Sequence, residues 1–65
     1  MKNPFITIQT CDEIPSDINI TYIVTYLKIS KDETRIYFMN GNRGDYLIAY
    51  KSLKKLIKNY YKQQK

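Results

Sequence analysis

Hydrophobic positions in the first fifty residues follow the short alternations that are typical of β-strands. Residues 5–10 (FITIQT) and 18–30 (INITYIVTYLKIS) are rich in β-branched and aromatic side chains, and 35–39 (RIYFM) and 46–50 (YLIAY) repeat this composition. The pattern therefore predicts about four strands in this part of the chain.

Three polar segments separate these predicted strands. Residues 11–17 contain Pro15, residues 31–34 (KDET) are polar throughout, and residues 40–45 (NGNRGD) contain both glycines of the protein. Proline and glycine clusters mark turns, and an Asn-Gly pair is a common hairpin signal. Connections this short favour an antiparallel arrangement.

Within residues 18–30 the phase of the alternation changes. The apolar side chains stand first at even positions, such as Ile18 and Ile20, and later at odd positions, such as Leu27 and Ile29. Since one residue of slip moves a side chain to the other face of a sheet, this change indicates a bulge, a strong bend or burial on both faces.

The last segment has the period of a helix. Ser52 is a suitable N-cap, and the apolar positions that follow it are spaced by three and four residues. They are Leu53, Leu56, Ile57, Tyr60 and Tyr61. We expect Leu56 and Ile57 to be buried against the sheet. The predicted fold class is α+β, a small antiparallel β-sheet or open barrel of about four strands followed by one C-terminal amphipathic helix, in a single domain over residues 1–65.

Positive charge is concentrated in the same segment. The chain has a net charge of +5, but residues 51–65 hold six lysines and no acid, while residues 1–50 are close to balanced. On a helix, Lys51, Lys55, Lys58 and Lys62 form one ridge with Lys54 beside it. Such a ridge can follow nucleic-acid phosphates, with Arg35 and Arg43 as additions, or it can be an ordinary solvated face.

Catalysis has little support in the sequence. There is no histidine, and the single cysteine, Cys11, stands beside Asp12 and Glu13, whose charges disfavour a thiolate. No phosphate-binding loop, dinucleotide fingerprint or metal-ligand set is present, so we predict a protein that is not an enzyme and has no cofactor.

Seven tyrosines provide an aromatic alternative to the basic helix. Aromatic rings on a sheet can stack on unpaired bases, but they can equally pack in or over a core. The tripeptide Arg43-Gly44-Asp45 matches an adhesion motif, although a turn at Gly44 with two solvated neighbours explains it as well.

Residues 19–60 resemble the first half of a LytTR-type DNA-binding domain. The matching segments are residues 20–23 (ITYI), 35–39 and 46–50, followed by Ser52–Leu56 (SLKKL). The resemblance implies DNA binding. The later strands of that family and their base-contacting loops have no counterpart here, so no family contact residue carries over.

These observations lead to two functional hypotheses. The first is a small nucleic-acid-binding protein, a regulator encoded by a phage or mobile element, that contacts DNA or RNA phosphates. The second is a small inhibitor or adaptor that binds a host protein. The N-terminus has no signal-peptide pattern and no apolar run approaches a membrane span, so we expect a cytoplasmic protein with no membrane partner.

Overall fold

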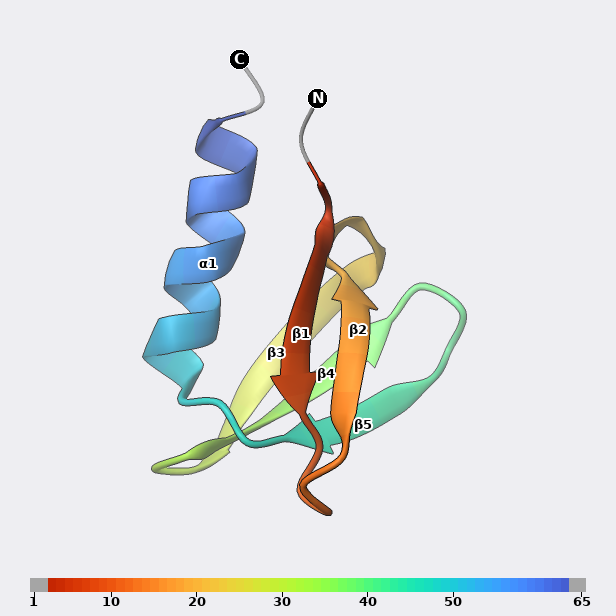
Figure 1. Cartoon of the computed structure of the whole chain (residues 1–65), viewed down its shortest axis with the longest axis vertical. Helices are drawn as coiled ribbons and strands as arrows, with labels where there is room; N and C mark the ends of the chain where they lie inside the picture. The colour runs from red at the N-terminus through yellow and green to blue at the C-terminus, as the bar shows by residue number, and fades with distance from the viewer. Residues whose placement is uncertain (1–2, 64–65) are drawn as a thin grey trace.

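The computed structural model describes residues 3–63, which form five strands, one short 3₁₀ turn and one helix (Figure 1). In chain order the elements are β1 (Phe5–Gln9), β2 (Pro15–Asn19), η1 (Ile20–Tyr22), β3 (Ile23–Ser30), β4 (Glu33–Phe38), β5 (Arg43–Tyr46) and α1 (Tyr50–Lys62). This arrangement confirms the predicted α+β class, with five strands where about four were expected.

The strands form two antiparallel sheets. One is the β1–β2 hairpin and the other is the β3–β4–β5 meander, and the hairpin crosses in front of the meander in Figure 1. Where the hairpin turns, the sheets are tied together: the Leu47 N–H donates to the Gln9 carbonyl at 2.8 Å, and the Cys11 N–H donates to the Asp45 carbonyl at 3.2 Å. The two sheets therefore share a corner and enclose one core.

The core lies between the sheets and the helix. Ile8, Ile18, Ile36 and Leu53 form its buried centre, so β1, β2, β4 and α1 each contribute one large aliphatic side chain. Thr34 is also fully buried, and its hydroxyl donates to the Ile48 carbonyl at 2.6 Å. This bond satisfies a buried polar group and fixes the chain between β5 and α1.

Strand β2 is the element that the sequence did not predict, because residues 11–17 carry the signals of a turn. Pro15 opens β2, pairs with Gln9, and lies on a strand whose only sheet neighbour is β1. Proline is tolerated at the first residue of an edge strand because no ladder hydrogen bond depends on its missing N–H. Ile18 on this strand is buried opposite Ile6.

The change of phase within residues 18–30 is a bend together with bulges. The 3₁₀ turn η1 separates β2 from β3, and the pairing of β3 with β4 slips between Ile23 and Thr25 and again between Lys28 and Ser30. These irregularities place Ile23 and Tyr26 in the partly buried layer, while Leu27 and Ile29 are exposed.

The predicted strand over residues 46–50 is wrong. Strand β5 comes earlier and ends at Tyr46, the Ile48 N–H donates to the Tyr46 carbonyl at 2.9 Å, and α1 already begins at Tyr50. The apolar side chains of this segment serve a connection that is partly buried on the core, and Ile48 packs there. A short apolar run can therefore belong to a buried connection as well as to a strand.

The helix also differs from its prediction in two details. Its N-cap is Ala49, which makes no side-chain capping bond, and Ser52 lies inside the helix. Leu53 is fully buried, but Leu56 is 40% exposed, so its expected burial is wrong. Because the two sheets already cover each other, α1 lies along one side of them (Figure 1) and buries only a narrow strip. In the described chain, no helix combines the length and the apolar character needed to cross a membrane.

Candidate nucleic-acid interface

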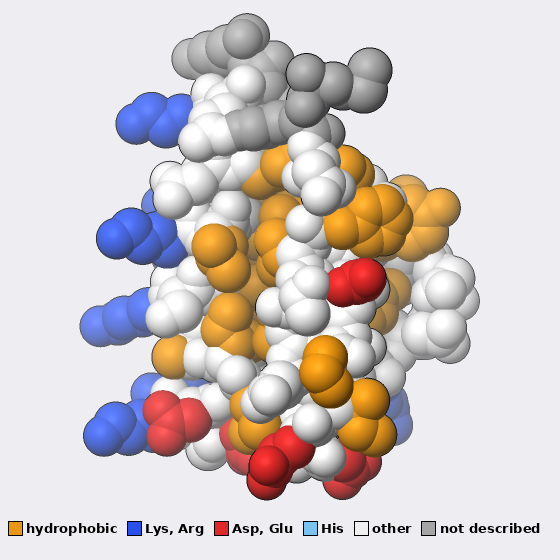
Figure 2. Space-filling model, in the orientation of Figure 1, with side chains coloured by type: hydrophobic (Ala, Val, Ile, Leu, Met, Phe, Trp, Pro, Cys, Tyr) orange, Lys and Arg blue, Asp and Glu red, His pale blue; other side chains and the backbone are white. Residues whose placement is uncertain are grey.

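The five lysines predicted from the sequence lie together on the outer face of α1. Lys51, Lys54, Lys55, Lys58 and Lys62 are all exposed, and they form a column along one side of the molecule (Figure 2). We call these five residues the lysine ridge. The side chains that face the core, among them Leu53 and Ile57, lie on the other side of the helix, so packing of the helix leaves the ridge free.

The ridge has the length of a short piece of nucleic-acid backbone. From Lys51 to Lys62 the helix rises about 16 Å, at about 1.5 Å per residue. One strand of B-DNA places a phosphate about every 3.4 Å along its axis, so the ridge spans about five phosphates. A shallow hollow of about 380 Å³ runs between Lys51, Lys54, Lys55, Lys58 and Asn59.

Two further lysines extend this surface beyond the helix. Lys28 and Lys31, from β3 and the β3–β4 turn, line a hollow of about 400 Å³ together with Tyr50 and Lys51. The rings of Tyr26 and Tyr50 pack at a centroid distance of 5.3 Å and hold the start of α1 against β3. Sequence spacing gave no signal of this neighbourhood, because it depends on how the helix docks.

Acids are scarce around the ridge. Helix α1 contains none, and Asp32 is the single acid that lines the hollow shared by Lys28, Lys31 and Lys51. In the part of the chain that the structure describes, the one ion pair joins Arg35 to Asp45 and involves no lysine. The lysines are therefore available to an external anion.

Arg35 is in a different situation. Its Nε lies 2.8 Å from Asp45 Oδ1 and its Nη2 lies 3.3 Å from Asp45 Oδ2, across the register of β4 and β5. The bond from Arg35 keeps the pKa of the Asp45 carboxyl below its usual range, and the same bond, with a further one to Tyr37, raises the pKa of the guanidinium. Arg35 is thus already paired with an anion within the protein.

Arg43 is exposed on β5, away from the ridge. It lines the edge of another pocket, and β5 begins on the side of the β1–β2 hairpin that is away from α1 (Figure 1). The structure therefore brings the five helical lysines together and adds Lys28 and Lys31, while Arg35 and Arg43 lie elsewhere.

The Arg43-Gly44-Asp45 tripeptide forms part of strand β5. Gly44 does not turn the chain: the turn residue with positive φ is Gly41, at +88°, and Gly44 is paired with Ile36. A Cβ on Gly44 would come within 2.9 Å of the Tyr46 ring, so the missing side chain makes room for that tyrosine. Asp45 is bound to Arg35 rather than simply solvated.

The tyrosines do not form a single exposed surface. Tyr22 is about half exposed in η1 and Tyr61 is about half exposed on α1, whereas Tyr26, Tyr37, Tyr46 and Tyr50 are partly buried. Burial raises the pKa of Tyr26 and of Tyr46. Most of the rings therefore contribute to packing, as one of the two alternatives predicted.

Cys11 is exposed and unpaired, far in sequence from the ridge. Its Sγ–H donates to Glu33 Oε2 at 3.4 Å. Partial loss of hydration, that bond and the charge of Glu33 raise the pKa of the thiol, which works against a reactive thiolate.

Comparisons with family models, with curated proteins and with solved structures found no match.

Proposed function

We propose that the protein binds nucleic acid through phosphate contacts made by the lysine ridge, with Lys28 and Lys31 continuing the contact surface. The observation that carries the proposal is the unbroken row of exposed lysines on α1, with no acid in the helix. Each lysine that neutralises a phosphate releases condensed counterions, and this release drives binding that is independent of sequence.

The helix itself supports a functional reason for its charge. Its N-cap makes no side-chain bond, its first turn contains no acid, and Lys51 stands in that turn. A cation there opposes the helix dipole, and a missing cap typically costs about 1 kcal/mol. A helix selected only for stability would carry an acid in the first turn and mix both signs along its exposed face.

The resemblance of residues 19–60 to a LytTR-type domain points to the same class of ligand. Phosphate contacts position a protein on a duplex without reading its sequence. We therefore propose a general affinity for DNA or RNA, in the setting of a small regulator from a phage or mobile element.

A protein partner is the second candidate. Strand β3 borders only β4 in its sheet, and it exposes Val24, Leu27 and Ile29, with Val24 at 65%. An edge strand with exposed apolar side chains is suited to addition of a partner's strand. This surface would serve an inhibitor or adaptor that binds a host protein.

The test of the first candidate is the salt dependence of duplex DNA binding. We expect wild-type affinity to fall steeply as salt rises, and the Lys55→Gln/Lys58→Gln/Lys62→Gln variant to flatten the slope of log K against log salt by about three. The variant keeps side-chain length and helix propensity, and removal of exposed charges should leave the melting temperature nearly unchanged.

Two results would contradict the proposal. One is a wild-type protein with no measurable affinity for duplex DNA at low salt, and the other is a variant whose slope equals that of the wild type. In either case the edge of β3 becomes the leading surface. Capture of host proteins by the wild type after nuclease treatment, and its loss on Val24→Asp, would then support the second candidate.

A further inference from the structure

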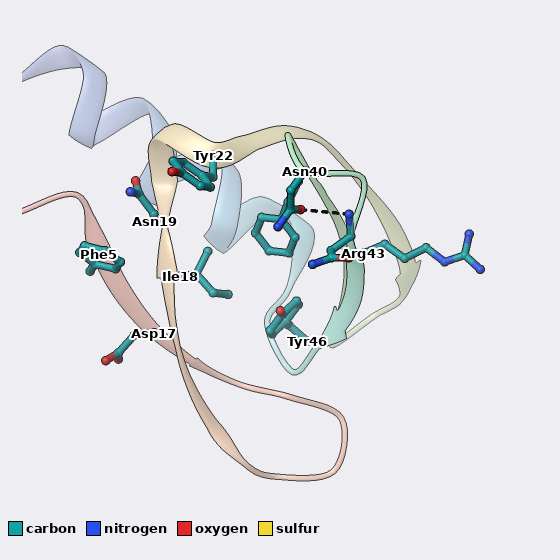
Figure 3. Close-up of a pocket in the computed structure, with 10 residues that line it drawn as sticks. Phe5, Asp17, Ile18, Asn19, Tyr22, Asn40, Arg43 and Tyr46 are labelled. Carbon is teal, nitrogen blue, oxygen red and sulfur yellow. Dashed lines mark hydrogen bonds between the residues drawn. The ribbon is translucent and has the colours of Figure 1, made fainter.

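A pocket of about 580 Å³ has none of the ridge lysines in its lining (Figure 3). It lies between β2, η1 and the β4–β5 loop. Its lining is mixed: four aromatic rings and an isoleucine, three asparagines, one acid and one base. The residues that would hold a ligand are Tyr22, Tyr46, Ile18 and Asn40. Its volume is within the range of about 300–1,000 Å³ that is common for small-molecule sites.

Aromatic surface surrounds the central part of the pocket. Tyr22 and Tyr46 lie on two sides of the opening, with Ile18 between them (Figure 3). The Tyr46 ring makes an edge-on contact with Phe38, at a centroid distance of 6.4 Å. It also lies over Gly44, where a side chain would leave it no room. Tyr22 is about half exposed, so its ring has a free surface on which a flat ligand can stack.

Asn40, at the rim of the pocket, presents a hydrogen-bond donor. The Asn42 N–H donates to Asn40 Oδ1 at 3.0 Å, which fixes the orientation of the Asn40 amide, since a backbone N–H cannot donate to an NH₂ group. Asn19 is fixed in the same way, because its Oδ1 accepts from the Thr21 N–H at 2.9 Å. The Asn40 NH₂ group has no acceptor among residues 3–63, so it can donate to a ligand carbonyl, whereas the Asn19 amide lies on the other side of β2 from Ile18 (Figure 3).

The charges of the pocket lie at different places around it. Asp17 accepts a hydrogen bond from the Thr7 hydroxyl at 2.7 Å and lies at the β1–β2 side. The Arg43 side chain extends from β5 away from the cavity into solvent (Figure 3). A ligand with its ring inside the pocket could keep an attached phosphate outside, on the Arg43 side, where no acid of the pocket opposes it.

From this geometry we infer that the pocket binds a single unpaired base that carries carbonyl groups, with thymine or uracil as the best match because each has two carbonyls and no exocyclic NH₂ group. The ring stacks on Tyr22 over the Ile18 and Tyr46 surface, and a base carbonyl accepts from the Asn40 NH₂. Adenine binds less well because it has no carbonyl. This inference rests on the proposed function, since it adds recognition of single strands to binding of phosphates.

The test uses a ligand that the lysine ridge cannot hold. Thymidine has no phosphate, so titration of the isotope-labelled full chain with thymidine, followed by NMR, isolates the pocket. We expect shifts in the ring signals of Tyr22 and Tyr46 and in the Asn40 side-chain amide, and weaker binding of adenosine. Tyr22→Ala should weaken thymidine binding about tenfold, because stacking on one aromatic ring has about that effect.

Matched variants separate recognition from folding. Asn40→Asp keeps the oxygen that accepts from the Asn42 N–H but replaces the NH₂ donor, and thymidine is uncharged, so weaker binding of thymidine would reflect the lost donor. Tyr61→Ala removes a ring that is exposed to a similar degree on α1, outside the pocket, and should bind thymidine as the wild type does.

The inference is overturned if thymidine leaves the pocket signals unmoved, if adenosine binds equally well, or if folded Tyr22→Ala binds thymidine as the wild type does. Duplex DNA binding is measured separately through the salt slope. Failure of the pocket and failure of the lysine ridge are therefore distinguishable.

Discussion

Arg35 and Asp45 show how one contact changes the role of a charged residue. Both stand on neighbouring strands, and the register of β4 and β5 places them opposite each other. The resulting pair is bidentate, a geometry that fixes the guanidinium plane. An arginine held in this way stabilises the meander, and it contributes less to an external anion than a free lysine does.

This pair gives stability a defined pH dependence. The pKa of Asp45 is lower in the folded protein than the ordinary value of about 3.9, so the pair stabilises the fold above about pH 4, and this stabilisation is lost as the pH falls through the folded pKa. We expect Asp45→Asn to lower the free energy of unfolding at pH 7 and to match the wild type at acid pH. Urea unfolding at several pH values measures the difference.

Asp32→Asn is the matched control for this experiment, because Asp32 is exposed and has no ion pair among the described residues. The free energy of unfolding of Asp32→Asn should differ little from that of the wild type at every pH. The free energy of unfolding of Asp45→Asn could instead differ from that of the wild type by the same amount down to the lowest pH. This result would show that the pair with Arg35 does not stabilise the fold.

Individual residues also show how far the sequence could predict the candidate site. The exposure of the helical lysines followed from their spacing alone, since opposite faces of a helix are set by its period. The pairing of Arg35 did not follow, because strand register decides it. The approach of Lys28 and Lys31 to Lys51 depends on the packing of Tyr26 on Tyr50, which no local pattern encodes.

Among the elements, α1 depends on a narrow strip of contact. Leu53 is in the centre of the core, whereas Leu56, one turn later, lies on the flank of the helix and keeps 40% of its surface exposed. The positions i and i+3 are neighbours on a helix, but they differ by about 60° around its axis. The buried strip of α1 is therefore so narrow that it includes Leu53 and leaves Leu56 partly exposed.

Leucine-to-alanine substitutions at these two positions should therefore differ strongly. We expect Leu53→Ala to cost about 2–5 kcal/mol, through lost burial and a cavity, and Leu56→Ala to cost about 1 kcal/mol or less. Thermal or urea unfolding of both variants measures these costs. Equal costs would mean that Leu56 is buried in solution, against the core or in an interface.

The sequence correctly predicted those strands that a local pattern of residues determines. Strands β1, β3 and β4 follow their β-branched and aromatic runs, and the helix follows its period. Strand β2 was not predicted because Pro15 and its polar neighbours are typical of turns. Proline is acceptable there because β2 is an edge strand, and a local sequence pattern does not show which strands lie at an edge. Residues 46–50 form a short apolar run like that of a strand, but the bond from Thr34 to the Ile48 carbonyl holds part of them in a connection.

At the scale of the whole molecule, charge is divided between regions. The lysine ridge occupies one side, and acidic side chains gather at the end formed by the β1–β2 and β3–β4 turns (Figure 2), where Asp12, Glu13 and Asp32 are exposed. The basic surface combines residues of α1 and β3 with Lys31 of the β3–β4 turn, next to Asp32.

This surface predicts a role for the two lysines outside the helix. Lys28→Gln/Lys31→Gln should flatten the salt slope of duplex DNA binding by about two, since each phosphate contact contributes about one. Arg43→Gln is the control, because it removes one charge on the other side of the molecule and should leave the slope unchanged. Equal slopes for the double variant and the wild type would confine the interface to α1.

The same division of charge acts before any contact forms. The ridge begins at Lys51, which lines a hollow together with Asp32, and continues to Lys62 along a helix that contains no acid, so the side-chain charge becomes more positive along α1. A polyanion repels the acidic end and attracts the other, and this torque turns the protein during diffusion. If the ridge binds a polyanion as proposed, we expect Lys62 and Lys58 to meet it first and Lys51 last.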